Sequence, residues 1–423
     1  MNNALICLIG SNPLPNYLVC QYLNSDNRDE EEKKFIPKPD KYIFLCSNET
    51  TIFAEKLQEK CQLFDKLSIV KLDNERNPMD IKDKLSKKLN EIARDADSIH
   101  LNYTGGTKPM AVHSYQCVKE FCGAKAIRFI ASDVSDEKSK IIIESDRTDV
   151  IYYPQDSIDS KKNLYNFVEI DCKTLFELHD MELDPERMRR TTSKLLDVNH
   201  DKIFEALTKE KEGEEIRNKI NEIKERIKNK NLEKINQDFE IVKKYNIDYE
   251  FGLNIDKNAT FESYSKNKFR AIIDYLHGKW LEDYLFKAIY KIKDELRLSE
   301  LRLSVKPKYK GRECDIDVIA IKGYKLYLFS CTTSNDIKIC KSKAFEAIYR
   351  ADQLGGSHAK AICVNFMPEK PNGKKSKEEK NNNEELLKDM SSFGAKMNFD
   401  YISLDILKDE KQLEEKLKAI FKD

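Results

Sequence analysis

The chain has 423 residues, of which 40% are hydrophobic and 35% are charged. This length exceeds what one ordinary hydrophobic core supports, so two or three domains are expected. Lysine plus arginine and aspartate plus glutamate each number 74, so the overall charge indicates no partner, and any nucleic-acid surface must be a local patch.

The composition favours a protein of the reducing cytoplasm. The first residues, MNNALICLIG, lack the basic region and long apolar core of a signal peptide. No apolar run approaches the roughly 18–20 residues that a membrane span needs. The 11 cysteines are scattered, mostly inside apolar runs and without a CxxC pair, which is typical of buried thiols. We therefore expect a cytoplasmic protein with no membrane partner.

Short apolar segments alternate with amphipathic segments over residues 1–155. The strand-like runs are ALICLIG, KYIFLC, LSIVKLD, SIHLNY and AKAIRFIAS, and all but the last are followed by helical spacing. KIIIES and DVIYYP add two further strands. The alternation predicts a parallel sheet with helices on both faces, a Rossmann-like α/β domain. Ligands of such sheets bind beyond the carboxyl ends of the strands.

Two polar turns follow strands of this domain. GSNPLPN follows the first strand, and TGGTKP, which begins at Thr104, follows the fourth. Gly105 and Gly106 let backbone N–H groups approach an anion, Lys108 offers a charge, and Pro109 suits a first helical turn, which favours phosphate. Neither turn is GxGxxG or GxxxxGK[ST], so ordinary NAD or ATP binding is disfavoured. A phosphate-binding cradle and a plain connection both remain open.

With GSNPLPNYL near its start and NYTGGTKPM at its fourth strand, the segment 1–155 resembles the CARF domain, the CRISPR-associated Rossmann fold. The resemblance implies a homodimer whose paired sheets form one symmetric pocket for a cyclic oligoadenylate, with cyclic tetra-adenylate and cyclic hexa-adenylate both open. The pocket residues that it implies are Ser11, Asn12, Ser47, Asn48, Thr104, Gly105, Gly106, Thr107, Lys108 and Met110. For Ser47 and Asn48, capping of the following helix is an equally open interpretation. Met110 is expected to face the ligand.

The middle of the chain, residues 156–265, is predicted to be a helix-rich segment. Its long charged stretch, KEKEGEEIRNKINEIKERIKNKNLEKINQDFEIVKKY, has Ile and Leu at helical spacing. A helical hairpin, a short coiled coil at a dimer seam and a solvated surface insertion all fit that pattern. A second charged segment, 369–385, is predicted to be a mobile loop.

Residues 266–423 are predicted to form a second α/β domain. A helix, FRAIIDYLHGKWLEDYLFKAIYKIKDEL, precedes three strands, LRLSVKPKY, DIDVIAIKG and KLYLFSCTTS, and these precede a helix, KSKAFEAIYRADQLGG, and a strand, AKAICVNF. This order resembles the core of the PD-(D/E)xK nucleases. The resemblance implies that an acidic residue on the second strand and an ExK motif on the third surround Mg²⁺ or Mn²⁺, which activates water for phosphodiester cleavage.

The acidic half of the nuclease pattern is present. Asp317 in RECDIDVIA aligns with the strand aspartate, with Asp315 and Glu313 beside it as substitutes, and Glu282 in GKWLEDY resembles the helix glutamate that often joins the site. The resemblance therefore implies Glu282 and Asp317 as metal ligands.

The ExK half is replaced by SCTT. Ser330 stands where the carboxylate is expected and Thr332 where the lysine is expected. Thr332 carries no charge, and a serine hydroxyl is a weaker metal ligand than a carboxylate. Three interpretations stay open: the next helix supplies the missing groups from Lys341, Lys343 or Glu346; the site works with fewer ligands; or the domain is a catalytically inactive binding platform.

Together the two ends of the chain resemble the CARF-containing ancillary nucleases of type III CRISPR systems. That resemblance implies a cyclic-oligoadenylate-activated, metal-dependent endonuclease that degrades DNA, RNA or both in antiviral defence. The alternative is an inactive sensor that binds nucleic acid or a partner. The catalytic candidates are Glu282, Asp315, Asp317, Ser330, Thr332 and Lys341. The six histidines form no HxxxH or HExxH pair, so a zinc site is not expected.

Overall fold

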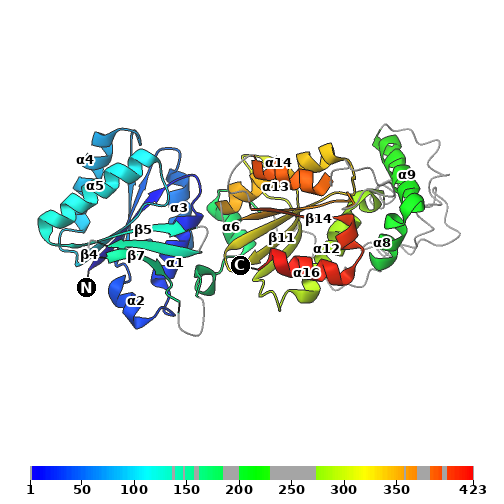
Figure 1. Ribbon diagram of the computed structural model, residues 1–423. Helices are drawn as coiled ribbons and strands as arrows, with labels where there is room; N and C mark the ends of the chain where they lie inside the picture. Colours follow the sequence, from blue (N-terminus) through cyan, green and yellow to red (C-terminus); the bar gives the residue numbers. More distant parts are fainter. Residues whose placement is uncertain are drawn as a thin grey trace.

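Figure 1 shows that the computed structural model consists of two α/β lobes side by side. The structure describes residues 2–135, 139–145, 148–156, 162–183, 200–228, 273–356, 359–368, 382–392 and 398–422. A seven-stranded sheet forms the centre of the N-terminal lobe, and a five-stranded sheet forms the centre of the C-terminal lobe. The predicted α/β class is therefore confirmed.

The N-terminal sheet has the strand order β3-β2-β1-β4-β5-β6-β7. Its strands are β1 (Asn3–Ile9), β2 (Lys41–Cys46), β3 (Leu67–Lys71), β4 (Ser98–Asn102), β5 (Arg128–Ser135), β6 (Lys140–Ser145) and β7 (Thr148–Tyr153). The first five pair in parallel, and β6 and β7 are added antiparallel. The chain order reverses between β1 and β4, and ligands of parallel sheets bind at such a switch point.

Helices cover both faces of this sheet. They are α1 (Leu14–Asn24), α2 (Glu30–Phe35), α3 (Thr51–Lys60), α4 (Pro78–Ile92) and α5 (Lys108–Lys125). Leu18 of α1 and Leu57 of α3 share a core with one face of β1. Leu85 of α4 and Val118 of α5 share a core with the other face. Every residue of β1 is buried, as expected for a central parallel strand.

A short segment joins the two lobes. It contains a 3₁₀ turn, Leu164–Asn166, and α6 (Cys172–Leu178), which contacts both α3 and α13 (Ile337–Gly355). The Ile170 amide donates to the Gly323 carbonyl of the C-terminal lobe over 2.9 Å. One continuous apolar core runs through both lobes as a result.

Two helices of the middle segment, α8 (His200–Thr208) and α9 (Glu210–Lys228), pack together and against the C-terminal lobe. Ile203 and Ile223 are buried in the same core as α12 (Trp280–Ile292). Within the described residues the helical prediction is confirmed, and these two helices cover a core rather than standing in solvent. The rest of the charged stretch, 229–245, lies outside the described residues.

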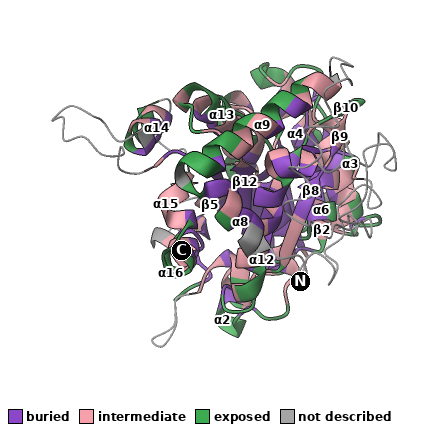
Figure 2. Ribbon diagram, turned by 90° about the vertical axis from the view of Figure 1, so that its right-hand side faces the viewer, coloured by how far each residue is buried: buried purple, intermediate pink, exposed green. Residues whose placement is uncertain are grey.

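The C-terminal sheet has the order β14-β13-β12-β11-β8. Its strands are β8 (Glu300–Val305), β11 (Ile316–Lys322), β12 (Lys325–Cys331), β13 (Lys360–Val364) and β14 (Phe399–Ile402), with β9 (Lys308–Tyr309) and β10 (Arg312–Glu313) as a separate pair. On one face α12 and α16 (Glu410–Ile420) share a core with the sheet, and on the other face α13 does. In Figure 2 the buried residues gather on these central strands and on the inward sides of the helices.

The predicted succession of helix, three strands, helix and strand is present as α12, β8, β11, β12, α13 and β13. The loop predicted at 369–385 is wrong over its last residues, because α14 (Asn382–Ser392) begins there. Asn383 is buried and donates to the Met367 carbonyl over 3.1 Å, and Leu386 is buried in the core. Residues 369–381 lie outside the described residues. A short helix, α15 (Leu404–Leu407), leads into α16.

No helix in the described parts of the chain is long and apolar enough to span a bilayer.

Candidate functional site

The two polar turns of the N-terminal lobe meet at one edge of its sheet. β1 and β4 are parallel neighbours, with Cys7 opposite Asn102, so the turns that follow them lie side by side. A Cβ at Gly10 would lie 2.9 Å from the Gly106 nitrogen, and a Cβ at Gly105 would lie 2.1 Å from the Leu8 carbonyl oxygen. Gly106 also has a φ of +75°. The turns therefore pack backbone against backbone, which only glycine permits.

A chain of buried amides lies beneath both turns. Asn16 Nδ2 donates to the Leu8 carbonyl over 2.9 Å, and Asn102 Nδ2 donates to Asn16 Oδ1 over 2.7 Å. Thr104 Oγ1 then donates to Asn102 Oδ1 over 2.8 Å and accepts from the Val134 amide over 2.9 Å. Asn16 and Asn102 are fully buried, so this chain fixes one turn relative to the other.

The chain of hydrogen bonds continues into the sheet through side chains that carry no charge. Ser132 Oγ lies 3.4 Å from Asn102 Oδ1, and His100 Nε2 lies 2.7 Å from Ser132 Oγ. Burial lowers the pKa of His100 to about 3, so the imidazole is neutral at physiological pH. We conclude that His100 is a structural member of the network.

The turns after β1 and after β2 place their predicted residues differently. Ser11 is exposed, and Asn12 Oδ1 accepts from the Leu14 amide over 3.0 Å. Ser47 is bound to Thr50, with Oγ–Oγ1 at 3.2 Å and an amide donated over 3.0 Å, while Asn48 is exposed. Ser47 Oγ also accepts the Thr50 amide over 3.2 Å, so Ser47 fixes the turn before α3, whose N-cap is Thr50. The pocket role of Ser47 and Asn48 stays a prediction.

The helix start after TGG carries the remaining predicted residues. Thr107 Oγ1 accepts from the Met110 amide over 3.4 Å and so caps α5, while Lys108 is exposed and pairs with no carboxylate among the described residues. Met110 was expected to face the ligand, but its side chain is 1% exposed and packs beneath Gly106, because α5 turns this position into the core. It supports the turn from below.

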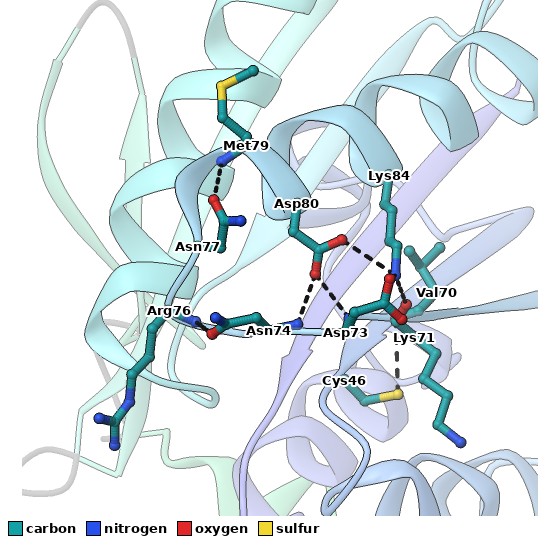
Figure 3. Close-up of polar contacts among 10 residues, drawn as sticks. All are labelled: Cys46, Val70, Lys71, Asp73, Asn74, Arg76, Asn77, Met79, Asp80 and Lys84. Atoms are coloured by element: carbon teal, nitrogen blue, oxygen red, sulfur yellow. Dashed lines mark hydrogen bonds and ion pairs between the residues drawn. The ribbon is translucent and has the colours of Figure 1, made fainter.

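Figure 3 shows the polar contacts of a third loop, between β3 and α4. Asp80 accepts the amides of Asp73 and Asn74 over 2.8 and 2.9 Å, and Lys84 pairs with Asp73 and Asp80 over 2.8 and 3.2 Å. Burial alone would raise the pKa of Asp80, but the Asn74 amide and Lys84 hold it below its ordinary value. The loop presents its Glu75 carbonyl to the Thr107 hydroxyl at 3.4 Å.

A second polar site lies at the end of β12 in the C-terminal lobe. A π-helical turn, Tyr275–Lys279, leads into α12, and its His277 carbonyl accepts the Thr333 hydroxyl over 3.1 Å. Glu282 lies in the first turn of α12 and accepts the Ser304 hydroxyl over 2.8 Å. Ser304 has a left-handed φ of 51° inside β8. Such backbone costs about 1–3 kcal/mol and is concentrated at functional sites.

Asp317 of β11 lies level with Ser304 in the sheet. The register that pairs Ile316 with Val305 places Asp317 opposite Ser304, and the register of β11 with β12 places it opposite Ser330. Its Oδ2 accepts the Cys331 amide over 2.7 Å. Burial raises the pKa of Asp317 to about 6, against the opposing effects of that amide and of Lys343.

The structure brings together only some of the predicted catalytic residues. Asp317 and Ser330 lie opposite each other in the sheet, with Ser330 buried, and Glu282 of α12 binds Ser304 on the adjacent strand. Thr332 lies beyond β12, where its hydroxyl accepts the Ser334 amide over 3.2 Å. Lys341 pairs instead with two carboxylates of α14, Glu385 at 3.0 Å and Asp389 at 2.6 Å.

Asp315 pairs with Lys306 over 2.9 Å. Its side chain is 58% exposed, so this carboxylate lies at the surface.

The side chains at this site could hold a hard cation such as Mg²⁺ with only one or two protein ligands. Within the described residues, no three His, Cys, Asp or Glu side chains come together as a metal site. Mg²⁺ is commonly held by one or two carboxylates and completes its shell with water. Glu282, which binds the Ser304 hydroxyl, and Asp317, which lies opposite Ser304 in the sheet, fit that pattern, with the Ser330 hydroxyl as a weaker neighbour.

The raised pKa of Asp317 predicts a stability change that needs no metal. Because the folded protein binds the proton more tightly than the unfolded chain, ionised Asp317 destabilises the fold above pH 6, and this penalty disappears below about pH 4. In EDTA, Asp317→Asn should stabilise the protein by roughly 1–3 kcal/mol at pH 7.5 and by nearly nothing at pH 4. Urea unfolding at both pH values measures this. Asp352→Asn, on the exposed surface of α13, is the control and should leave the free energy of unfolding unchanged. If Asp317→Asn is no more stable than the parent protein at pH 7.5, the prediction is contradicted.

Comparison with known proteins supports the N-terminal assignment. Residues 5–157 match the family model described as the Card1 CARF domain. The N-terminal lobe is a CARF-like domain. Over the whole chain the fold is similar to protein VC1899 from Vibrio cholerae, with a TM-score of 0.60 and 14% identity, covering 99% of this chain and 98% of that chain.

It is also similar to Can2 from Sulfobacillus thermosulfidooxidans, solved in complex with cyclic tetra-adenylate, with a TM-score of 0.60 and 12% identity over 100% of both chains. At these identities the two structures show a shared fold. No curated protein matches the chain.

Proposed function

We propose that this protein is a cyclic-oligoadenylate-activated, metal-dependent nuclease of type III CRISPR defence. The match of residues 5–157 to the Card1 CARF domain, and the fold shared with Can2, which was solved with cyclic tetra-adenylate, support the ligand class. The observation that carries the proposal is the pair of adjacent turns after β1 and β4, residues 10–16 and 104–109, which we call the cradle. The two glycine turns pack together beside the start of α5, where Lys108 is exposed and has no ion pair with the residues that the structure describes.

The cradle residues suit a ring of nucleotides. The amides at the start of α5 and the Lys108 ammonium bind phosphate, since a helix N-terminus favours an anion. The exposed Ser11 and the neighbouring Asn12 offer groups that hydrogen-bond ribose hydroxyls. One chain presents one such cradle, so a cyclic ligand with two-fold symmetry fits a homodimer that contributes the cradle twice.

The carboxylates of Glu282 and Asp317, together called the acidic row, suit phosphodiester hydrolysis. Glu282 and Asp317 would hold Mg²⁺ or Mn²⁺, which supplies an activated water and offsets charge on the phosphate. Asp317 is kept in position by the Cys331 amide, and Glu282 by the Ser304 hydroxyl. Because the pKa of Asp317 is about 6, this carboxylate is ionised at neutral pH, as a cation ligand must be.

Helix α13 connects the cradle to the acidic row. At its C-terminal end, a Cβ on Gly356 would lie 2.4 Å from Asn12 Nδ2 of the first turn. Nearer its middle, the Arg350 guanidinium donates to the Asp315 carbonyl, two residues before Asp317. A ligand that moves the first turn therefore also acts on α13, which contacts the nuclease-like site. Ligand binding can in this way shift the protein between an inactive and an active conformation.

Gly356→Ala is expected to uncouple the two sites. The added methyl group meets Asn12, and the φ of +60° at this position suits only glycine. We expect ring-stimulated cleavage to fall by about tenfold, a shift of roughly 1.4 kcal/mol, while basal cleavage stays unchanged. The matched control is Gly311→Ala, since Gly311 has a φ of +76° and nothing within 4 Å of its Cβ position. Equal losses in both variants would mean that strain alone explains the effect.

The proposal is tested by measuring ring binding and cleavage on one sample. Isothermal titration with cyclic tetra- and hexa-adenylate should show tight binding of one ring per two chains, and the same ring should switch on cleavage of plasmid or RNA with Mn²⁺ or Mg²⁺. The replacement of ExK by Ser330 and Thr332 favours a second candidate, an inactive sensor. Ring binding without cleavage under either metal would establish that sensor instead.

A further inference from the structure

The nuclease-like site lacks a cation at the position where the ExK pattern has its lysine. Thr332 occupies that position, and its hydroxyl and amide are both engaged, with Ser334 and with the Val364 carbonyl. A phosphodiester carries a negative charge that grows on its oxygens during hydrolysis, so a positive group beside the metal ligands accelerates the reaction. The question is which residue of this chain supplies it.

Among the lysines of α13 near this site, Lys341 is held elsewhere by its ion pairs with Glu385 and Asp389 of α14. Lys343, two residues on, points to a different face of the helix, because successive residues are separated by about 100°. It makes one long ion pair, with Glu346 at 3.5 Å, and its side chain is 45% exposed. Lys343 is thus able to reach a substrate, whereas Lys341 is not.

The face of α13 that carries Lys343 is directed at the start of β11. Positions 343, 346 and 350 lie on one stripe of the helix. Glu346 pairs with both Lys343 and Arg350, and the Arg350 guanidinium donates to the carbonyl of Asp315. The buried Ala344 and Ala347 between them pack on the sheet and fix the rotation of the helix.

The strands beneath α13 bring Asp317 and Ser330 together. The register of β11 with β12 places Asp317 opposite Ser330, and Cys363 of β13 is the register partner of Ser330. Arg350, on the same stripe of α13 as Lys343, donates to the carbonyl of Asp315, two residues before Asp317.

We propose that Lys343 of α13 is a catalytic residue that binds the scissile phosphate beside Asp317 and takes the place of the lysine absent from position 332. This rests on the proposed nuclease function. In the step, the oxygen of a water bonds to phosphorus while the bond from phosphorus to the leaving sugar oxygen breaks. The water loses a proton to solvent, and the leaving oxygen gains one. The Lys343 ammonium keeps its protons and neutralises a non-bridging oxygen throughout.

Cleavage kinetics test the proposal in the full-length, ring-activated protein. Lys343→Met should lower kcat by about a hundredfold, as the loss of one donor to a transition state does, with little change in KM. Lys343→Arg should restore most of the rate. Lys338→Met is the control, because Lys338 is an exposed lysine near the start of the same helix. Cleavage by Lys343→Met at the rate of the Lys338→Met control would overturn the proposal.

A second readout separates this proposal from the nuclease function itself. In EDTA, fluorescence anisotropy with a labelled phosphorothioate oligonucleotide should show weaker binding by Lys343→Met and a salt dependence reduced by about one phosphate contact. Ring affinity and melting temperature should match the parent protein. If the parent protein cleaves nothing, the nuclease function fails, and this binding still decides whether Lys343 contacts phosphate. Unchanged oligonucleotide binding and salt slope in the variant would refute the contact.

Discussion

Asp317→Ala is expected to abolish metal-dependent cleavage, lowering the rate by at least about a thousandfold, because a two-carboxylate site cannot lose one ligand and keep its cation. Asp317 is the carboxylate that the sheet register places between Ser304 and Ser330. Ring binding should be unchanged, since the cradle lies in the other lobe. Plasmid and RNA cleavage with Mn²⁺, with the activating ring present, measures the effect.

Asp352→Ala supplies the matched control for this prediction. Asp352 is an exposed aspartate on α13, so its loss should leave cleavage within about twofold, as expected for surface substitutions away from a site. A variant lacking Asp317 that still cleaves would show that hydrolysis takes place elsewhere in the chain or in a contaminant.

Gly105→Ala is expected to remove ring binding, weakening it by at least about a hundredfold, or roughly 2.7 kcal/mol. A methyl group at this position would lie 2.1 Å from the Leu8 carbonyl oxygen and 2.9 Å from Asn16 Nδ2. The second turn must therefore move away from the first, which opens the chain of buried amides through Asn16 and Asn102. Overpacking of this kind also lowers stability by about 1–3 kcal/mol.

The same helix offers a control glycine for this experiment. Gly123 lies in α5, and a Cβ there meets nothing within 4 Å. Gly123→Ala should bind the ring as the parent does and gain up to about 1 kcal/mol of stability from helix propensity. Titration calorimetry and urea unfolding of both variants measure the contrast. Full ring affinity in Gly105→Ala would mean that the cradle does not hold the ligand.

The alternation of apolar and amphipathic segments predicted the strands and main helices of the N-terminal lobe correctly, because the central strands β1, β2 and β4 are buried on both faces and the helices pack one face on the sheet. The glycine turn could also be predicted, since its chemistry is local to TGGTK. Asn16 and Asn102 were missed, because an asparagine in the first turn of a helix or at the end of a strand has the same sequence pattern whether it faces solvent or joins a buried network. The only signal in the sequence is that each stands beside one of the two polar turns.

The polar site of the C-terminal lobe could be predicted only in part. Asp317 and Glu282 lie in recognisable segments, but whether a lysine reaches them depends on what packs around α13. Lys341 and Lys343 lie on different faces of the predicted helix, but the sequence does not show that Lys341 pairs with carboxylates of α14. The first residues of that helix, up to 385, were predicted to belong to a loop, because its charged start hides the buried Asn383. The left-handed backbone of Ser304 leaves no trace in the sequence.

We propose that ligand in the cradle controls cleavage at the acidic row. The most direct test is the rate of plasmid and RNA cleavage by the full-length protein with Mn²⁺, measured with and without cyclic tetra-adenylate and cyclic hexa-adenylate. We expect cleavage that depends on one of the rings and disappears in both Asp317→Ala and Gly105→Ala. Cleavage that is equally fast without any ring, or that persists in Gly105→Ala, would contradict this control.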